Sequence, residues 1–247
     1  MRYEITLDKK PSVIYITLEV PSQRRISIVG YDANKKDTVY FARSKSISGR
    51  QTIEIPMPLV PEVLTLDINQ QGGGFGAYIN ILDVKVKDFP NVTSAFPKNT
   101  LEFYNFIKVI AEKTGTLKPG FYISKDENFV VWVKEDLDGD STPARVNRRT
   151  GVTKWNLSKM RDFTVYMRVF IGLHEYFHYA LQTTDEVACD TNALKVYLSM
   201  GYPKSEANYA MTKIFDNSPE AIKRVKVMDT IIKQHDQQNK NSQPVKR

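Results

Sequence analysis

Cysteine, histidine and long apolar runs are scarce in this sequence of 247 residues, which has one cysteine and three histidines. A single cysteine excludes the disulfide framework of a small secreted scaffold. No apolar run reaches the roughly 20 residues that a membrane-spanning helix needs. The N-terminal Met1-Arg2-Tyr3-Glu4 lacks the apolar core of a signal peptide, so we expect a cytoplasmic protein that does not associate with membranes.

Positive charge is in excess but dispersed. The chain has 35 Lys and Arg residues against 28 Asp and Glu residues, which gives a formal net charge of +7. The only dense basic stretch is Lys223-Arg224-Val225-Lys226, in a segment with helical periodicity. We interpret this stretch as a solvated helix face rather than a nucleic-acid site, so a nucleic-acid partner is not expected.

Two of the three histidines lie in one five-residue motif, H-E-x-x-H, formed by His174, Glu175 and His178. On a helix, positions i and i+4 share a face, so both imidazoles can meet one metal ion. Zinc in catalytic sites keeps one position open for water and lowers the pKa of that water to about 7. The pattern therefore predicts a zinc site with Glu175 as general base. The alternative is a pair of histidines satisfied in the core of an apolar helix.

A catalytic zinc needs a third protein ligand. The segment after the motif reads as a second helix that starts near Thr183, because Thr183 and Glu186 have the spacing of a capping box. The connection is then a short turn centred near Gln182, and the two helices form an antiparallel hairpin. Partners across such a hairpin have position numbers with a constant sum, so we expect Glu186 to face His178.

The same register places Asp190 opposite His174. We predict Glu186 as the third zinc ligand, and we predict that Asp190 accepts a hydrogen bond from the outer nitrogen of His174. Two alternatives stay open: Glu186 is only a capping residue, or Asp185 is the ligand instead.

These motifs resemble those of the gluzincin metallopeptidases, in which HExxH is followed by a downstream helix with E-x-x-x-D. The resemblance implies that His174, His178 and Glu186 bind zinc, that Glu175 is the general base, and that Asp190 orients a ligand. One departure concerns the link between the two motifs, which is much shorter than is usual in that clan. The short link puts the substrate preference in doubt more than the metal binding.

The predicted fold class is α+β with two domains. Residues 1–90 contain short alternating apolar runs separated by turn-forming clusters, which predicts an antiparallel β-sandwich of about seven strands. Residues 97–247 are predicted to form a zincin-like lobe with C-terminal helices at about 204–215 and 218–237. Within this lobe, residues 144–155 are our candidate for the edge strand that pairs with an extended substrate, and an ordinary hairpin is the alternative.

Two functions fit the sequence. The first is a zinc-dependent metallopeptidase that hydrolyses peptides or proteins, with one tyrosine among Tyr179, Tyr197, Tyr202 and Tyr209 available to stabilise the oxyanion. The second is a structural or assembly protein, such as a phage virion or tail component. In that case a zincin-like scaffold is retained, the β-sandwich makes subunit contacts, and the chain forms a homo-oligomer or a larger assembly.

Overall fold

The computed structural model describes five stretches of the chain, residues 1–71, 79–90, 96–137, 142–214 and 218–241. The fold class is α+β: an antiparallel sheet is followed by a second, smaller sheet and by C-terminal helices, which confirms the predicted class. The chain divides into two compact units. The first comprises Met1–Thr93, Thr164–Tyr166 and Gly201–Pro203, and the second comprises Ser94–Phe163, Met167–Met200 and Lys204–Arg247.

The first unit is built on a five-stranded antiparallel sheet. Its strands are β1 (Arg2–Thr6), β2 (Ser12–Asp32), β3 (Lys35–Met57), β4 (Val63–Gln71) and β5 (Asn80–Asp88). One edge of β2 pairs with β3 along its length, while the other edge pairs first with β5 and then with β4. Alternate positions of these strands, such as Ile14, Ile16 and Leu18, are fully buried, as the period of two in the sequence requires.

The described residues of the first unit form five strands and not the predicted seven or so, because two turn-like clusters lie inside long strands. The register of β2 against β3 shifts between Val20 and Arg24, opposite Gly49 and Ile47. Gly49 adopts a positive φ of 64°, which glycine tolerates and which suits a β-bulge. The breakers Pro21 and Gly49 therefore bend one continuous hairpin and do not end its strands.

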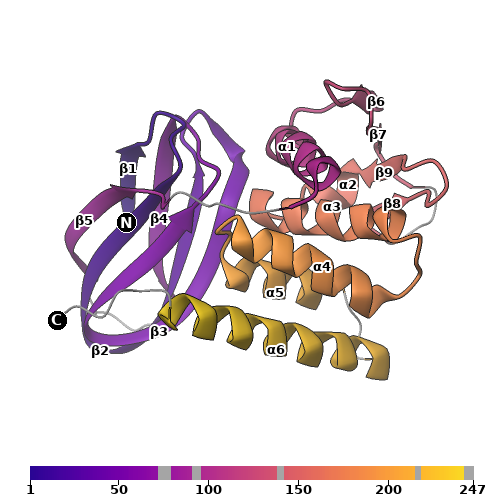
Figure 1. The fold of residues 1–247 in the computed structure, drawn as a ribbon. Coiled ribbons are helices and arrows are strands. Elements are labelled where there is room, and N and C mark those ends of the chain that lie inside the picture. Colours follow the sequence, from indigo (N-terminus) through magenta and orange to yellow (C-terminus); the bar gives the residue numbers. More distant parts are fainter. Residues whose placement is uncertain (72–78, 91–95, 138–141, 215–217, 242–247) are drawn as a thin grey trace. The chain divides into compact units, whose positions relative to one another are not determined.

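The second unit combines a four-stranded sheet with six helices in its described residues (Figure 1). The helices are α1 (Lys98–Lys113), α2 (Leu157–Met160), α3 (Val165–Ala180), α4 (Glu186–Ser199), α5 (Lys204–Ile214) and α6 (Pro219–Asn241). The strands are β6 (Gly120–Ile123), β7 (Val130–Lys134), β8 (Ala144–Val146) and β9 (Thr153–Asn156). Every helix in the described stretches is too short or too polar to cross a lipid bilayer.

The small sheet has the strand order β6-β7-β9-β8, so β8 is an edge strand. β8 and β9 form an antiparallel hairpin over residues 144–156, which includes the candidate segment 144–155, and β7 pairs with β9 in parallel. Val131, Val133 and Trp155 point from this sheet into the core and are fully buried. The inner face of the sheet is thus buried. The residues that alternate with these, such as Trp132 and Lys154, lie on the outer face.

The helix that carries the HExxH motif, α3, begins at Val165, after the separate short helix α2. The side chain of Asn156 accepts a hydrogen bond from the Lys159 N–H, so it caps the short α2 instead of the motif helix α3. A close approach then fixes α3 against α1, since a Cβ added at Gly172 would lie 2.3 Å from Cγ1 of Ile107. The glycine two residues before His174 therefore lets the motif helix sit deep in the core.

A buried arginine joins three helix ends in the second unit. Arg168 on α3 is 1% exposed and donates hydrogen bonds to the carbonyls of Ala111 (3.0 Å) and Met160 (2.7 Å), at the C-terminal ends of α1 and α2. Burial lowers the pKa of Arg168 to about 10. Because helix C-termini carry partial negative charge, these carbonyls solvate the guanidinium and hold the motif helix in place.

Candidate metal centre

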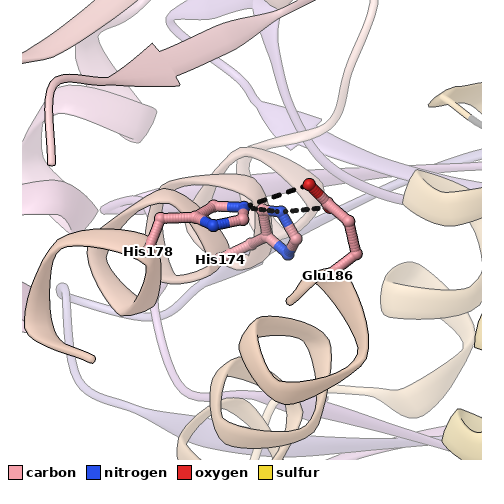
Figure 2. Close-up of side chains that lie close together, drawn as sticks. All are labelled: His174, His178 and Glu186. Atoms are coloured by element: carbon pink, nitrogen blue, oxygen red, sulfur yellow. Dashed lines mark hydrogen bonds and ion pairs between the residues drawn. The ribbon is translucent and has the colours of Figure 1, made fainter. Parts of the chain in front are cut away.

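His174 and His178 lie one turn apart on α3 and present their Nε2 atoms to a common point. The two Nε2 atoms are 3.0 Å apart. The Glu186 carboxylate, at the start of α4, has one oxygen 3.2 Å from His174 Nε2 and the other 3.4 Å from His178 Nε2. Figure 2 shows both rings and the carboxylate converging from these two helices. The proximity expected from the hairpin register is therefore observed.

These spacings fit the coordination shell of zinc. With zinc–ligand distances of about 2.0–2.1 Å, neighbouring ligand atoms of a tetrahedral site lie about 3.3 Å apart. The two imidazole nitrogens are 3.0 Å apart, and a different oxygen of Glu186 lies near each of them, at 3.2 and 3.4 Å, so each separation is close to this value. Two imidazole nitrogens and a carboxylate are also the donor set of a class of catalytic zinc sites that keep one position open. The residues thus fit the metal both in geometry and in chemistry.

The outer ring nitrogens bind acceptors that direct the inner nitrogens toward their common point. His174 Nδ1 lies 2.8 Å from the Asp190 carboxylate, and His178 Nδ1 lies 3.0 Å from the carbonyl oxygen of Thr183. Both partners accept hydrogen bonds, so each Nδ1 carries the hydrogen and each Nε2 of a neutral ring carries a lone pair. Such outer contacts fix the tautomer and the orientation of metal-binding histidines.

The ionisable groups of the cluster shift one another's pKa values strongly. Burial opposes the charged form of His174, but hydrogen bonds to Asp190 and Glu186 outweigh it and raise its pKa to about 9. Contacts with the Cys189 thiol and with Glu186 raise the pKa of His178 to about 11. The hydrogen bonds from both histidines hold the pKa of Glu186 far below its usual range. The ionised carboxylates therefore stabilise a positive charge, here a proton on each imidazole, at the point where the ligand atoms meet.

Arg224 on α6 binds the two carboxylates of α4. Its Nε and Nη2 donate to the two oxygens of Asp190 at 2.6 and 3.0 Å, and Nη2 lies 3.1 Å from Glu186 Oε2. Burial opposes the charged form of Asp190, but hydrogen bonds from His174 and Arg224 lower its pKa. A bidentate arginine fixes the plane of a carboxylate, so Arg224 orients Asp190 and through it the His174 ring. In Figure 1, α3, α4 and α6 run side by side, as these contacts require.

The Glu175 carboxylate is held by the edge strand of the small sheet. The backbone N–H of Val146, the last residue of β8, donates to Glu175 Oε2 at 2.8 Å. Burial raises the pKa of Glu175, and the nearby His174 and His178 only partly offset this. A carboxylate with a raised pKa, beside a metal position and fixed by one hydrogen bond, is suited to exchange a proton with a bound water.

A cleft of about 420 Å³ opens beside these residues. One part of its wall is apolar and is formed by α3 and α5, with Phe170, Ile171, Met211 and Ile214. Another part is formed by β8 and the residues around it, including Ala144 and Val146. His174, Glu175, His178 and Glu186 all line the same cleft, so a ligand in it would reach the metal position and the candidate base together.

The alternatives for the third ligand differ in position. Asp185, not Thr183, is the N-cap of α4, because its side chain accepts hydrogen bonds from the N–H groups of Val187 and Ala188. The predicted capping box is therefore wrong, and the Glu186 side chain does not cap the helix. The short turn centred near Gln182 is confirmed, with Gln182 at a φ of 50°. Asp185 is occupied at the helix start, while Glu186 reaches the histidines.

The four tyrosines considered for oxyanion stabilisation do not belong to the described lining of the cleft. Tyr179 packs beneath Gly151, and Tyr197 is buried edge-on against Phe170. Arg224 was missed by sequence reasoning, which assigned its stretch to a solvated face. The only signal in the sequence was indirect: two carboxylates one helical turn apart attract a cation, but many arginines and lysines could supply it.

A scan against models of known protein families finds none that matches this sequence, and a search of curated proteins finds no match either.

Proposed function

We propose that this chain is a zinc-dependent metallopeptidase that hydrolyses peptide bonds in peptide or protein substrates. One observation carries the proposal. The ligand atoms of His174, His178 and Glu186 converge at 3.0–3.4 Å, while both outer ring nitrogens are tied to acceptors. The resemblance of the two motifs to those of gluzincins supports the same chemistry.

Each residue of the site has a role in this proposal. His174, His178 and Glu186 would hold a zinc ion, which would act as a Lewis acid toward the scissile carbonyl and would lower the pKa of a bound water. Glu175 takes a proton from the water and delivers it to the leaving amine, a role that suits a carboxyl whose pKa is raised by burial. Asp190 holds the His174 ring in the tautomer that leaves Nε2 free to bind.

The edge strand β8 is suited to bind the backbone of an extended substrate. In an antiparallel hairpin, backbone groups of alternate residues point away from the partner strand. The Val146 N–H points away from β9 and toward the cleft, where it binds Glu175. Ala144 lies two residues before Val146, so its backbone groups face the same side, where its carbonyl accepts a hydrogen bond from the Thr142 hydroxyl. A peptide added along this edge passes the candidate base without any requirement for a particular sequence.

The test combines metal analysis with peptide cleavage. The purified protein is expected to retain close to one zinc per chain and to cleave members of a proteome-derived peptide library, with cleavage abolished by a chelator and restored by zinc. Glu175→Gln should keep the zinc and lose cleavage by a factor of about 10² or more. Glu62→Gln, the same change at an exposed residue of the first unit, should leave both unchanged.

Two results would oppose the proposal. If the purified protein contains no zinc and takes up none when zinc is added, the three residues do not form a zinc site and the proposal fails. Retained zinc without cleavage by the wild-type chain favours the structural or assembly alternative, in which the metal site no longer supports chemistry.

A further inference from the structure

The outer face of the small sheet carries aromatic rings where a solvated sheet usually carries polar side chains. The strand register places Phe121 of β6, Trp132 of β7 and Lys154 of β9 in one row across the sheet. Arg145 of the edge strand β8 continues the row. Phe121 is 64% exposed, and Ile123, two residues along the same strand, is 57% exposed. Exposed apolar patches on a protein surface often mark binding sites, so this face is a candidate interaction surface.

The rings of this row are stacked on each other. The centroids of Phe121 and Trp132 lie 5.2 Å apart with an interplanar angle of 20°. The ammonium groups of Lys154 and Lys134 lie 5.4 and 5.2 Å from the Trp132 ring. Two lysines thus flank the stacked indole and phenyl rings, and the row ends at its most exposed ring, Phe121 on the edge strand β6. We call Phe121, Trp132, Lys134 and Lys154 the aromatic–basic face.

We propose that the aromatic–basic face binds single-stranded nucleic acid, with an unpaired base stacked on Phe121 and neighbouring phosphates bound by Lys134 and Lys154. This inference concerns a surface outside the metal centre and does not depend on the proposed peptidase activity. Sequence-tolerant binding of single strands combines aromatic platforms for bases with nearby cations for the backbone. The face supplies both on one side of the small sheet.

The charged side chains of the row itself are basic. Arg145 of β8 continues the row beyond Lys154, and the exposed Lys118 precedes β6 near Lys134. Acidic residues occur in the adjacent turns, where Glu135 follows Lys134 and forms an ion pair with Arg161. The positive charge within the row suits a phosphate backbone.

The dispersed lysines of the sequence give no sign of this surface. Lys134 and Lys154 are 20 positions apart in the chain and become neighbours because β7 pairs with β9 in parallel. The expectation that nucleic acid is not a partner rested on the spread of charge along the chain. The pairing of β7 with β9 places these two lysines beside the same tryptophan ring.

A direct binding assay tests the proposal. Fluorescence anisotropy of a labelled oligothymidylate of about ten nucleotides is measured with the full chain, and an oligouridylate is compared. Two lysine–phosphate contacts predict that affinity falls about sevenfold between about 50 and about 200 mM salt. Trp155 is buried and Trp132 is partly exposed, so quenching of the intrinsic tryptophan fluorescence reports stacking near Trp132.

Variants separate stacking from charge. Phe121→Ala should weaken binding at least about fivefold, and Phe121→Tyr should retain it, because both rings stack. Lys154→Glu should weaken binding and reduce the salt dependence. The matched controls are Tyr3→Ala and Lys36→Glu, which remove an exposed aromatic ring and an exposed charge from the first unit and should leave binding within about twofold. All these side chains are exposed, so circular dichroism should show a folded protein in each case.

Three outcomes would overturn the proposal. The first is no change of anisotropy even at the lower salt concentration. The second is equal binding by wild type and Phe121→Ala, which would mean that the net charge of the chain attracts the oligomer without the face. The third is binding to vesicles that contain phosphatidylserine, with no binding to either oligomer, which would assign the same rings and lysines to a membrane surface.

Discussion

Replacement of Asp190 by asparagine isolates the contribution of one carboxylate to the candidate metal centre. Asp190 is 2% exposed and accepts three hydrogen bonds, one from His174 Nδ1 and two from the Arg224 guanidinium. An asparagine has nearly the same shape but one acceptor oxygen in place of two. Its amide N–H₂ must therefore face either the imidazole N–H or the guanidinium, and both of these are donors.

The expected loss follows from these contacts. A ligand histidine without its carboxylate partner typically binds metal 10 to 100 times more weakly, so we expect Asp190→Asn to lower zinc affinity by about 10- to 100-fold. This corresponds to about 1.4–2.7 kcal/mol. The variant also leaves the largely buried Arg224 with Glu186 as its remaining acceptor among the α4 carboxylates. Removing one partner of such a pair costs about 3 kcal/mol of stability in the metal-free protein.

Zinc affinity is measured by competition with a chromophoric chelator, and stability is measured by urea unfolding of the metal-free protein. Asp185→Asn is the matched control, since it makes the same change five positions away at the N-cap of α4. Asparagine caps helices as well as aspartate does, so the control should bind zinc like wild type. Wild-type affinity in Asp190→Asn, or an equal loss in Asp185→Asn, would refute the assignment of Asp190 as the residue that orients His174.

Further predictions concern protons, packing and the edge strand. Both imidazoles of the metal-free site have raised pKa values, about 9 and about 11, so zinc binding at neutral pH should release about two protons and weaken as the pH falls. Calorimetry in buffers of different ionisation enthalpy counts these protons, and no release would contradict the ligand assignment. Gly172→Ala should lower the free energy of unfolding by about 1–3 kcal/mol, although alanine favours helices, because its Cβ overlaps Ile107. A stabilised variant in thermal unfolding would refute the close packing. Val146→Pro removes the N–H that holds Glu175 while an edge strand tolerates proline, so zinc content should persist and cleavage should fall about tenfold or more. Unchanged cleavage would show that this hydrogen bond is dispensable.

Local spacing predicted the centre of the site. His174 and His178 are four positions apart on a helix, and the short turn at Gln182 returns the chain at once, so Glu186 and Asp190 come opposite the histidines by register alone. Contacts between adjacent helices joined by a tight turn depend on few degrees of freedom, which is why a sequence pattern captures them.

Contacts across large separations in the chain could not be predicted in this way. Arg224 lies 34 positions after Asp190, and the Val146 amide that binds Glu175 belongs to a strand 29 positions before it. Neither partner has a distinctive residue type, since the chain offers many basic side chains and nearly every residue has a backbone N–H. Only the packing of α6 on α4 and the place of β8 at the sheet edge select these two.

In the first unit, local sequence signals predicted strand ends that the structure does not have. Pro21 and Gly49 are local breakers, and alone they indicate turns. In the folded chain the hydrogen bonds on both sides of the bulge continue in one hairpin, so the cooperative pairing of β2 with β3 overrides the local preference.

The sequence by itself determined the α+β class, the motif helix and the set of groups able to bind a metal, because these follow from residue type and helical period. Tertiary structure alone decided which cation orients the carboxylates, which amide holds Glu175, and which lysines meet the rings of the small sheet. These are choices among chemically equivalent residues, and only the positions of the elements in space distinguish them.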